Sequence, residues 1–115
     1  MEYKTLNLKD FMPTVDQALK MIELEVELCK KEGIKILKVI HGYGSSGVGG
    51  EIRKALKNWS KISIRKKLFL DFIRGEEFLG ESEKVKSAKE ICPEIIGDID
   101  LFHANPGLSL IVIQK

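Results

Sequence analysis

Apolar residues recur at two different spacings along this chain, and the spacings predict its strands and helices. Four segments have the pattern of a strand: residues 3–8, 36–40, 67–73 and 108–113. Leu6 and Leu8 lie two residues apart, which is the spacing of one face of a strand. Residues 36–40 form an almost continuous apolar run, which is typical of a strand in the middle of a sheet.

Three further segments have the spacing of an amphipathic helix: residues 14–33, residues 49 or 50 to 59, and residues 82–92. The first begins with Thr14 and Gln17, which predict a capping box, and Gly33 is placed to end it. Met21, Leu24 and Leu28 widen its apolar stripe, so we expect them to face the core. The element order is therefore strand, helix, strand, helix, strand, short helix, strand.

This order predicts an α/β fold of the βαβαβ(α)β type, a two-layer sandwich with a mixed four-stranded sheet. The first two strands and the helix between them form a βαβ unit, so these strands should be parallel, with a right-handed crossover. With 115 residues and 43% hydrophobic residues, the chain is expected to form a single domain over residues 1–115.

Composition and charge exclude only a few classes of function. Charged residues make up 31% of the chain but leave a net charge of +2, so any basic surface must come from clustering. Cys29 and Cys92 lack metal-ligand spacing and are expected to be buried thiols. The sequence shows no secretion signal and no apolar run as long as a membrane span, so we expect a cytoplasmic protein without a membrane partner.

The most informative stretch is the glycine-rich segment between the second strand and the second helix. It contains five glycines: Gly42, Gly44, Gly47, Gly49 and Gly50. A glycine loop that leads into a helix presents backbone N–H groups and the positive end of the helix dipole, a combination suited to phosphate. The sequence therefore predicts a phosphate-binding site at this loop.

Two well-known nucleotide-binding loops resemble this segment. Residues 42–47 match GxGxxG, the dinucleotide-binding pattern, and Asp71 on the following strand is a candidate for the ribose-binding acid. The frame also resembles a P-loop, but Val48 stands where the phosphate-binding lysine is needed, which excludes an NTPase of that type. A dinucleotide or another phosphorylated ligand stays an alternative.

His41, directly before the glycines, has two interpretations. Its imidazole either hydrogen-bonds to the loop and shapes it, or acts as a general acid or base or as a phosphate ligand. His103 lies near a turn signal and is expected to be an ordinary loop residue.

The residues around this loop resemble the small MutS-related (Smr) domain family. Ile40-His41-Gly42-Tyr43-Gly44, followed by Ile52-Arg53-Lys54-Ala55-Leu56, is similar to that family's HGxG…LRxAV core. The helix start from Thr14 to Leu19 is similar to its T-x-x-E-A-L pattern, and residues 105–113 to its last turn and strand. The resemblance implies a fold similar to the C-terminal domain of the third bacterial translation initiation factor. It also implies nucleic-acid binding, with DNA nicking or RNA cleavage in several members.

The first strand departs from the pattern of the cleaving members, which carry L-D-x-H-G there. In this chain Asn7 stands in place of the Asp, Lys9 in place of the His, and Asp10 in place of the Gly. An amide cannot act as a general base, and a lysine ammonium is a poor base at neutral pH. Lys9 is either a phosphate contact or a solvated loop residue.

We therefore expect a module that binds the backbone of DNA or RNA, with weak or no nuclease activity. The expected phosphate contacts are Lys9, Gly42, Tyr43, Gly44, Ser45, Ser46, Gly47, Gly49, Gly50, Arg53 and Lys54. The alternative is an active endonuclease that uses His41 and Asp10. No cofactor or resident metal is expected, and a divalent metal would enter only with catalysis.

Overall fold

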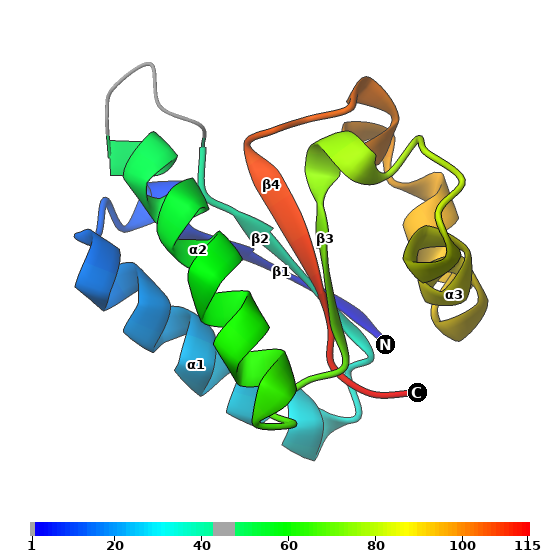
Figure 1. The fold of residues 1–115 in the computed structure, drawn as a ribbon, viewed down its shortest axis with the longest axis horizontal. Helices are drawn as coiled ribbons and strands as arrows, with labels where there is room; N and C mark the ends of the chain where they lie inside the picture. The colour runs from blue at the N-terminus through cyan, green and yellow to red at the C-terminus, as the bar shows by residue number, and fades with distance from the viewer. Residues whose placement is uncertain (1, 43–47) are drawn as a thin grey trace.

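The computed structural model describes residues 2–42 and 48–115. The strands are β1 (Tyr3–Asn7), β2 (Ile36–Ile40), β3 (Asp71–Arg74) and β4 (Leu108–Val112), and the α-helices are α1 (Val15–Glu32), α2 (Val48–Arg65) and α3 (Glu83–Ile91). Short 3-10 helices are η1 (Leu8–Asp10), η2 (Gly75–Glu77), η3 (Pro93–Gly97) and η4 (Ile99–His103). Figure 1 shows how these elements surround the sheet.

The four strands form one mixed sheet in the order β1-β2-β4-β3. β1 and β2 are parallel, with Tyr3 opposite Ile36 and Asn7 opposite Ile40. β4 runs antiparallel to both of its neighbours, β2 and β3. The predicted mixed four-stranded sheet and the parallel pairing of the first two strands are therefore confirmed.

Local sequence signals set the ends of α1 as predicted. The Thr14 hydroxyl accepts the Gln17 N–H at 3.2 Å, and the Gln17 side chain accepts the Thr14 N–H at 2.9 Å. This reciprocal pair satisfies N–H groups that a helix start otherwise leaves unbonded. Gly33 ends the helix with φ of +75°, a conformation that glycine adopts without steric cost.

The sheet buries apolar side chains on both faces. On one face α1 and α2 cover a core that includes Leu37, Val39 and Ile111. On the other face α3, η3 and η4 cover Ile36 and Leu110 (Figure 1). The sheet and the helices α1 and α2 thus form the predicted two layers. The short elements α3, η3 and η4 cover the opposite face of the sheet. Cys29 and Cys92 are free and buried, as predicted.

Two predicted boundaries were wrong. α2 continues six residues past Trp59, to Arg65, because the small Ser60 and Ser63 occupy buried positions where the pattern of apolar residues breaks. The third strand begins at Asp71 instead of residue 67, because the chain first has to close α2: Lys67 takes a left-handed conformation, and the Leu68 N–H bonds back to the Ser63 carbonyl at 2.9 Å.

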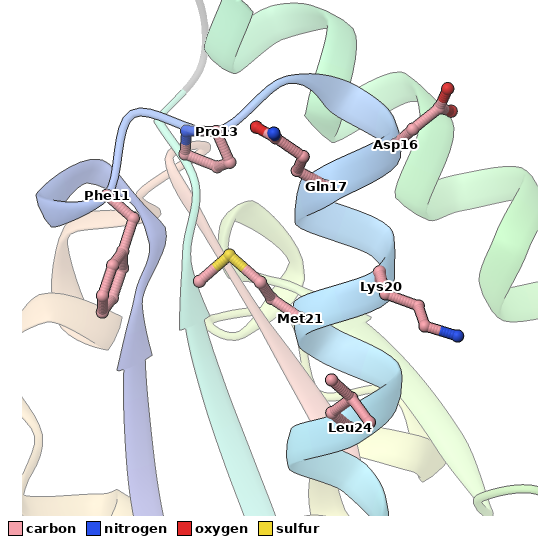
Figure 2. A pocket seen from close by; sticks show the side chains of 7 residues that line it. All are labelled: Phe11, Pro13, Asp16, Gln17, Lys20, Met21 and Leu24. Carbon is pink, nitrogen blue, oxygen red and sulfur yellow. The ribbon is translucent and has the colours of Figure 1, made fainter.

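Leu24 and Leu28 do not face the core as expected, since Leu24 is 57% exposed and Leu28 is 48% exposed. Together with Met21, Leu24 forms one side of a shallow groove of about 590 Å³, and Phe11 and Pro13 form the other (Figure 2). Leu24 thus lines an open groove instead of the core, and Leu28 is also exposed.

Candidate functional site

The candidate residues gather at one end of the sheet, where β1 and β2 finish, which we call the loop end. Because Asn7 and Ile40 are register partners in parallel strands, the segments that follow them leave the sheet side by side. Lys9 and Asp10 follow β1, whereas His41 and Gly42 follow β2. The topology thus brings the predicted groups to a common end of the sheet, and α2 begins at this end (Figure 1).

His41 is held inside the protein, with 3% of its surface exposed. Its Nδ1 lies 2.5 Å from the carbonyl oxygen of Gly42, and its Nε2 lies 3.0 Å from the hydroxyl of Ser109. Because a carbonyl oxygen only accepts, Nδ1 carries the proton and Nε2 accepts the Ser109 hydroxyl when the ring is neutral. Both ring nitrogens are therefore used by the protein itself.

The environment of His41 favours its neutral form. Burial lowers the pKa of His41 below its ordinary value of 6.5, and the positive charge of Arg53 lowers it further, while the Gly42 carbonyl opposes the change. The backbone N–H groups of His41 and Gly42 both bond to the Gly107 carbonyl at 2.9 Å. Gly42 itself has φ of +75°, so the imidazole supports a turn that glycine makes possible.

The residues after β1 are arranged differently. The Asn7 side chain accepts the Lys9 N–H at 3.1 Å and thereby caps η1. Lys9 and Asp10 are exposed, and neither side chain forms an ion pair with the residues that the structure describes. Lys9 is thus an exposed cation at the loop end without an ion-pair partner among the described residues, while Asn7 caps η1.

Arg53 and Lys54, in the second turn of α2, differ in their availability. Arg53 donates through Nη2 to both carboxylate oxygens of Glu76, at 2.6 Å each. Lys54 is exposed and has no ion pair among the described residues. Sequence reasoning did not find Glu76, whose charge at the loop end offsets that of Arg53.

Glu76 is positioned by a close backbone contact. It follows Gly75, where an added Cβ would lie 2.1 Å from the Asn105 carbonyl oxygen and 2.8 Å from that of Leu108. Only glycine fits such a contact, so η2 approaches the turn before β4 closely. A glycine at the end of a strand is the sequence signal that could have indicated this approach.

The remaining predicted phosphate contacts belong to the glycine loop. Gly49 and Gly50 lie in the first turn of α2, which begins at Val48, within one or two residues of the predicted start. Tyr43, Gly44, Ser45, Ser46 and Gly47 lie outside the described residues.

The geometry argues against the dinucleotide interpretation. Asp71 pairs with Val112, which in turn pairs with Ile36, so Asp71 lies at the end of the sheet where β1 and β2 begin. A ribose-binding acid has to lie at the loop end, beside the glycines. Asp71 instead accepts the N–H of Phe72 at 2.8 Å.

A buried polar cluster that sequence reasoning missed lies on the second face of the sheet. Lys38, in the middle of β2, donates to Asp98 at 2.8 Å and to Asp100 at 2.9 Å, and Tyr3 donates to Asp98 at 2.6 Å. Burial alone would lower the pKa of Lys38, but the two carboxylates raise it. The protonated amine of Lys38, with its two carboxylate partners, links η4 to the sheet. The only sequence signal for this cluster was a lysine within an apolar strand.

The sheet order and the two parallel leading strands define a mixed α/β domain. The structure is similar to the crystal structure of the Smr domain of Thermus thermophilus MutS2, with a TM-score of 0.56 and 16% sequence identity over 100% of both chains. No family model matches the sequence, and no curated protein sequence matches it. At this identity the similarity establishes the fold alone, so the predicted Smr-like fold is confirmed.

Two absences concern the part of the chain that the structure describes, residues 2–42 and 48–115. Within them, no three His, Cys, Asp or Glu side chains come together in a way that could hold a metal ion. Within the same residues, no helix is both long and apolar enough to cross a membrane.

Proposed function

We propose that this chain is an Smr-type module that binds the sugar–phosphate backbone of nucleic acids and cleaves it weakly or not at all. The observation that carries the proposal is the loop end, where the exposed cation Lys9 follows β1 beside the Gly42 turn that follows β2. Lys54, at the start of α2, adds a second free cation among the described residues. Lysine ammonium groups and helix N–H groups are suitable contacts for phosphate.

The low cleavage activity follows from the same residues. Phosphodiester cleavage needs a base or a metal ion to activate the nucleophile. His41 is buried with both ring nitrogens engaged, so its main task in this proposal is to shape the Gly42 turn. Asn7 is an amide that caps η1, and Lys9 is an ammonium group, so neither supplies the base. Asp10 is the only carboxylate in the segment that follows β1.

Binding is tested by fluorescence anisotropy with a labelled duplex at several salt concentrations. Each phosphate contact contributes about −0.9 to the slope of log K against log salt. Lys9→Gln should therefore make the slope shallower by about 0.9 and weaken binding at low salt. Lys20→Gln is the matched control, because Lys20 is also an exposed lysine but lies on α1. No binding at low salt, or equal effects of the two variants, would contradict the proposal.

Cleavage is tested by nicking of supercoiled plasmid and by degradation of a labelled RNA. We expect little activity from the natural chain and a gain from Asn7→Asp with Lys9→His, which restores an acid and an imidazole at the loop end. Aspartate is also a good cap, so this variant should keep η1 intact. Robust nicking by the natural chain that is lost with Asp10→Asn would instead support the nuclease alternative.

A further inference from the structure

The positive charge of this protein is concentrated on one helix. α2 contains five basic residues and one acidic residue, Glu51, so it carries four more positive than negative charges. The whole chain has a net charge of only +2, which means that the residues outside α2 are net negative. α1, which packs beside α2, carries five acidic and three basic residues. The charge is therefore segregated in space, although the composition is nearly balanced.

Four of the cations form a stripe, which we call the basic face of α2: Lys54, Lys57, Lys61 and Arg65. At 3.6 residues per turn these four positions fall within roughly 80° of the helix circumference and extend over roughly 16 Å. All four are exposed, while Ile52 and Leu56 on the opposite side of the helix are buried in the core. Lys66 and Lys67, also exposed, continue the positive charge past the helix end.

Within residues 2–42 and 48–115, no acidic side chain pairs with the basic face. None of its four cations forms an ion pair with a residue that the structure describes, whereas Lys4, Lys35 and Arg53 all pair with glutamates. Like charges four residues apart, such as Lys57 with Lys61 and Lys61 with Arg65, destabilise a helix by about 0.2–0.5 kcal/mol per pair. The isolated domain thus carries a repulsion that an external polyanion would relieve.

We propose that the basic face of α2 lies along the backbone of a nucleic-acid duplex and is the main source of its binding affinity. This inference rests on the proposed function and extends its site, because Lys54 belongs both to the loop end and to the basic face. In this proposal, α2 makes most of the electrostatic contacts with the nucleic acid, and the glycine loop makes the smaller share. Binding through phosphates alone is independent of sequence and strongly dependent on salt.

A duplex fits this surface better than a single strand. Proteins that bind single strands stack the bases on aromatic side chains. The only aromatic residue of α2 is Trp59, whose ring packs against Phe69 with centroids 5.4 Å apart and whose Nε1 donates to Glu23 at 3.3 Å. A rigid row of cations without a stacking surface suits the regular phosphate spacing of a double helix.

A membrane surface fits less well. Helices that lie in the membrane interface insert an apolar face beside their basic face. The apolar side of α2 is used by the core, and Ile62 is the one large apolar side chain that it exposes among the described residues.

The test is duplex binding by a triple variant of the basic face, Lys57→Gln with Lys61→Gln and Arg65→Gln. Its matched control changes three exposed lysines on other helices, Lys20→Gln with Lys31→Gln and Lys86→Gln, so both variants lose the same net charge. Loss of three contacts should make the salt slope shallower by about 2.7 and weaken binding by roughly several hundredfold at about 0.1 M salt. The control should bind within a few-fold of the natural chain. Circular dichroism and urea unfolding would show that both variants are folded.

The outcomes separate this inference from the proposed function. If Lys9→Gln weakens binding and the basic-face variant does not, the proposed function stands and the basic face is excluded. If the natural chain binds no duplex at low salt, both are wrong. Equal or tighter binding to a single strand of the same length, or to vesicles rich in phosphatidylserine, would also overturn the inference. A selective loss of duplex binding in the basic-face variant would support it.

Discussion

The ion pair between Arg53 and Glu76 allows a direct test of how the loop end is controlled. The carboxylate presents two oxygens to one guanidinium nitrogen at 2.6 Å, much as a phosphate would. A phosphate that approaches Arg53 must therefore compete with Glu76. Replacing Glu76 by Gln removes the competing charge while keeping the size of the side chain, and we expect this variant to bind nucleic acid more tightly than the natural chain.

The magnitude follows from one additional contact. If Arg53 is released to a phosphate, the salt slope should steepen by about 0.9, and the affinity at about 0.1 M salt should rise roughly fivefold to tenfold. The cost to folding should stay below about 1 kcal/mol, because 34% and 31% of the two side chains are exposed and exposed ion pairs contribute little. Binding and stability should thus change in opposite directions.

The assay is an anisotropy titration of a labelled duplex over about 50 to 200 mM salt. Glu81→Gln is the matched control, because Glu81 is exposed, lies five residues further along the chain, and has no ion pair among the described residues. Equal gains from the two variants would show that net charge alone is responsible. A loss of affinity in the Glu76 variant would refute the reasoning, because it would mean that Arg53 binds phosphate only when Glu76 positions it.

Two predictions concern stability. Lys38→Met should reduce the free energy of unfolding in urea by about 3 kcal/mol, because it leaves the largely buried carboxylate of Asp98 without its cation. Adding Asp98→Asn should restore part of the lost stability. A cost of Lys38→Met below about 1 kcal/mol would show that the Lys38–Asp98 pair does not stabilise the fold in this way. His41 should make stability depend on pH, because its pKa in the fold is below 6.5 and the unfolded chain binds its proton first. The contribution is complete above about pH 6.5 and is lost as the pH falls toward the lower pKa of the folded state, so His41→Gln should remove this pH dependence below about pH 6.5.

The sequence by itself determined the elements whose signals are local. The capping box of Thr14 and Gln17 and the left-handed Gly33 involve residues at most a few positions apart, so the start and end of α1 were predictable. The apolar run of residues 36–40 and the length of the βαβ unit were enough to predict parallel β1 and β2. The gathering of Lys9, Asp10 and His41 at one end of the sheet followed from that topology.

Only the tertiary structure decided what these residues do there. His41 is engaged by Ser109, which lies 68 residues away, and Arg53 is neutralised by Glu76, which lies 23 residues away. Such pairs depend on how β4 and η2 pack, and no local pattern encodes that. Because Ser60 and Ser63 are polar but buried, the apolar periodicity did not reveal the last turns of α2 or the full length of the basic face. Periodicity reports which side of a helix is apolar, but a small polar residue that fits a tight contact is recognised only when its neighbours are in place.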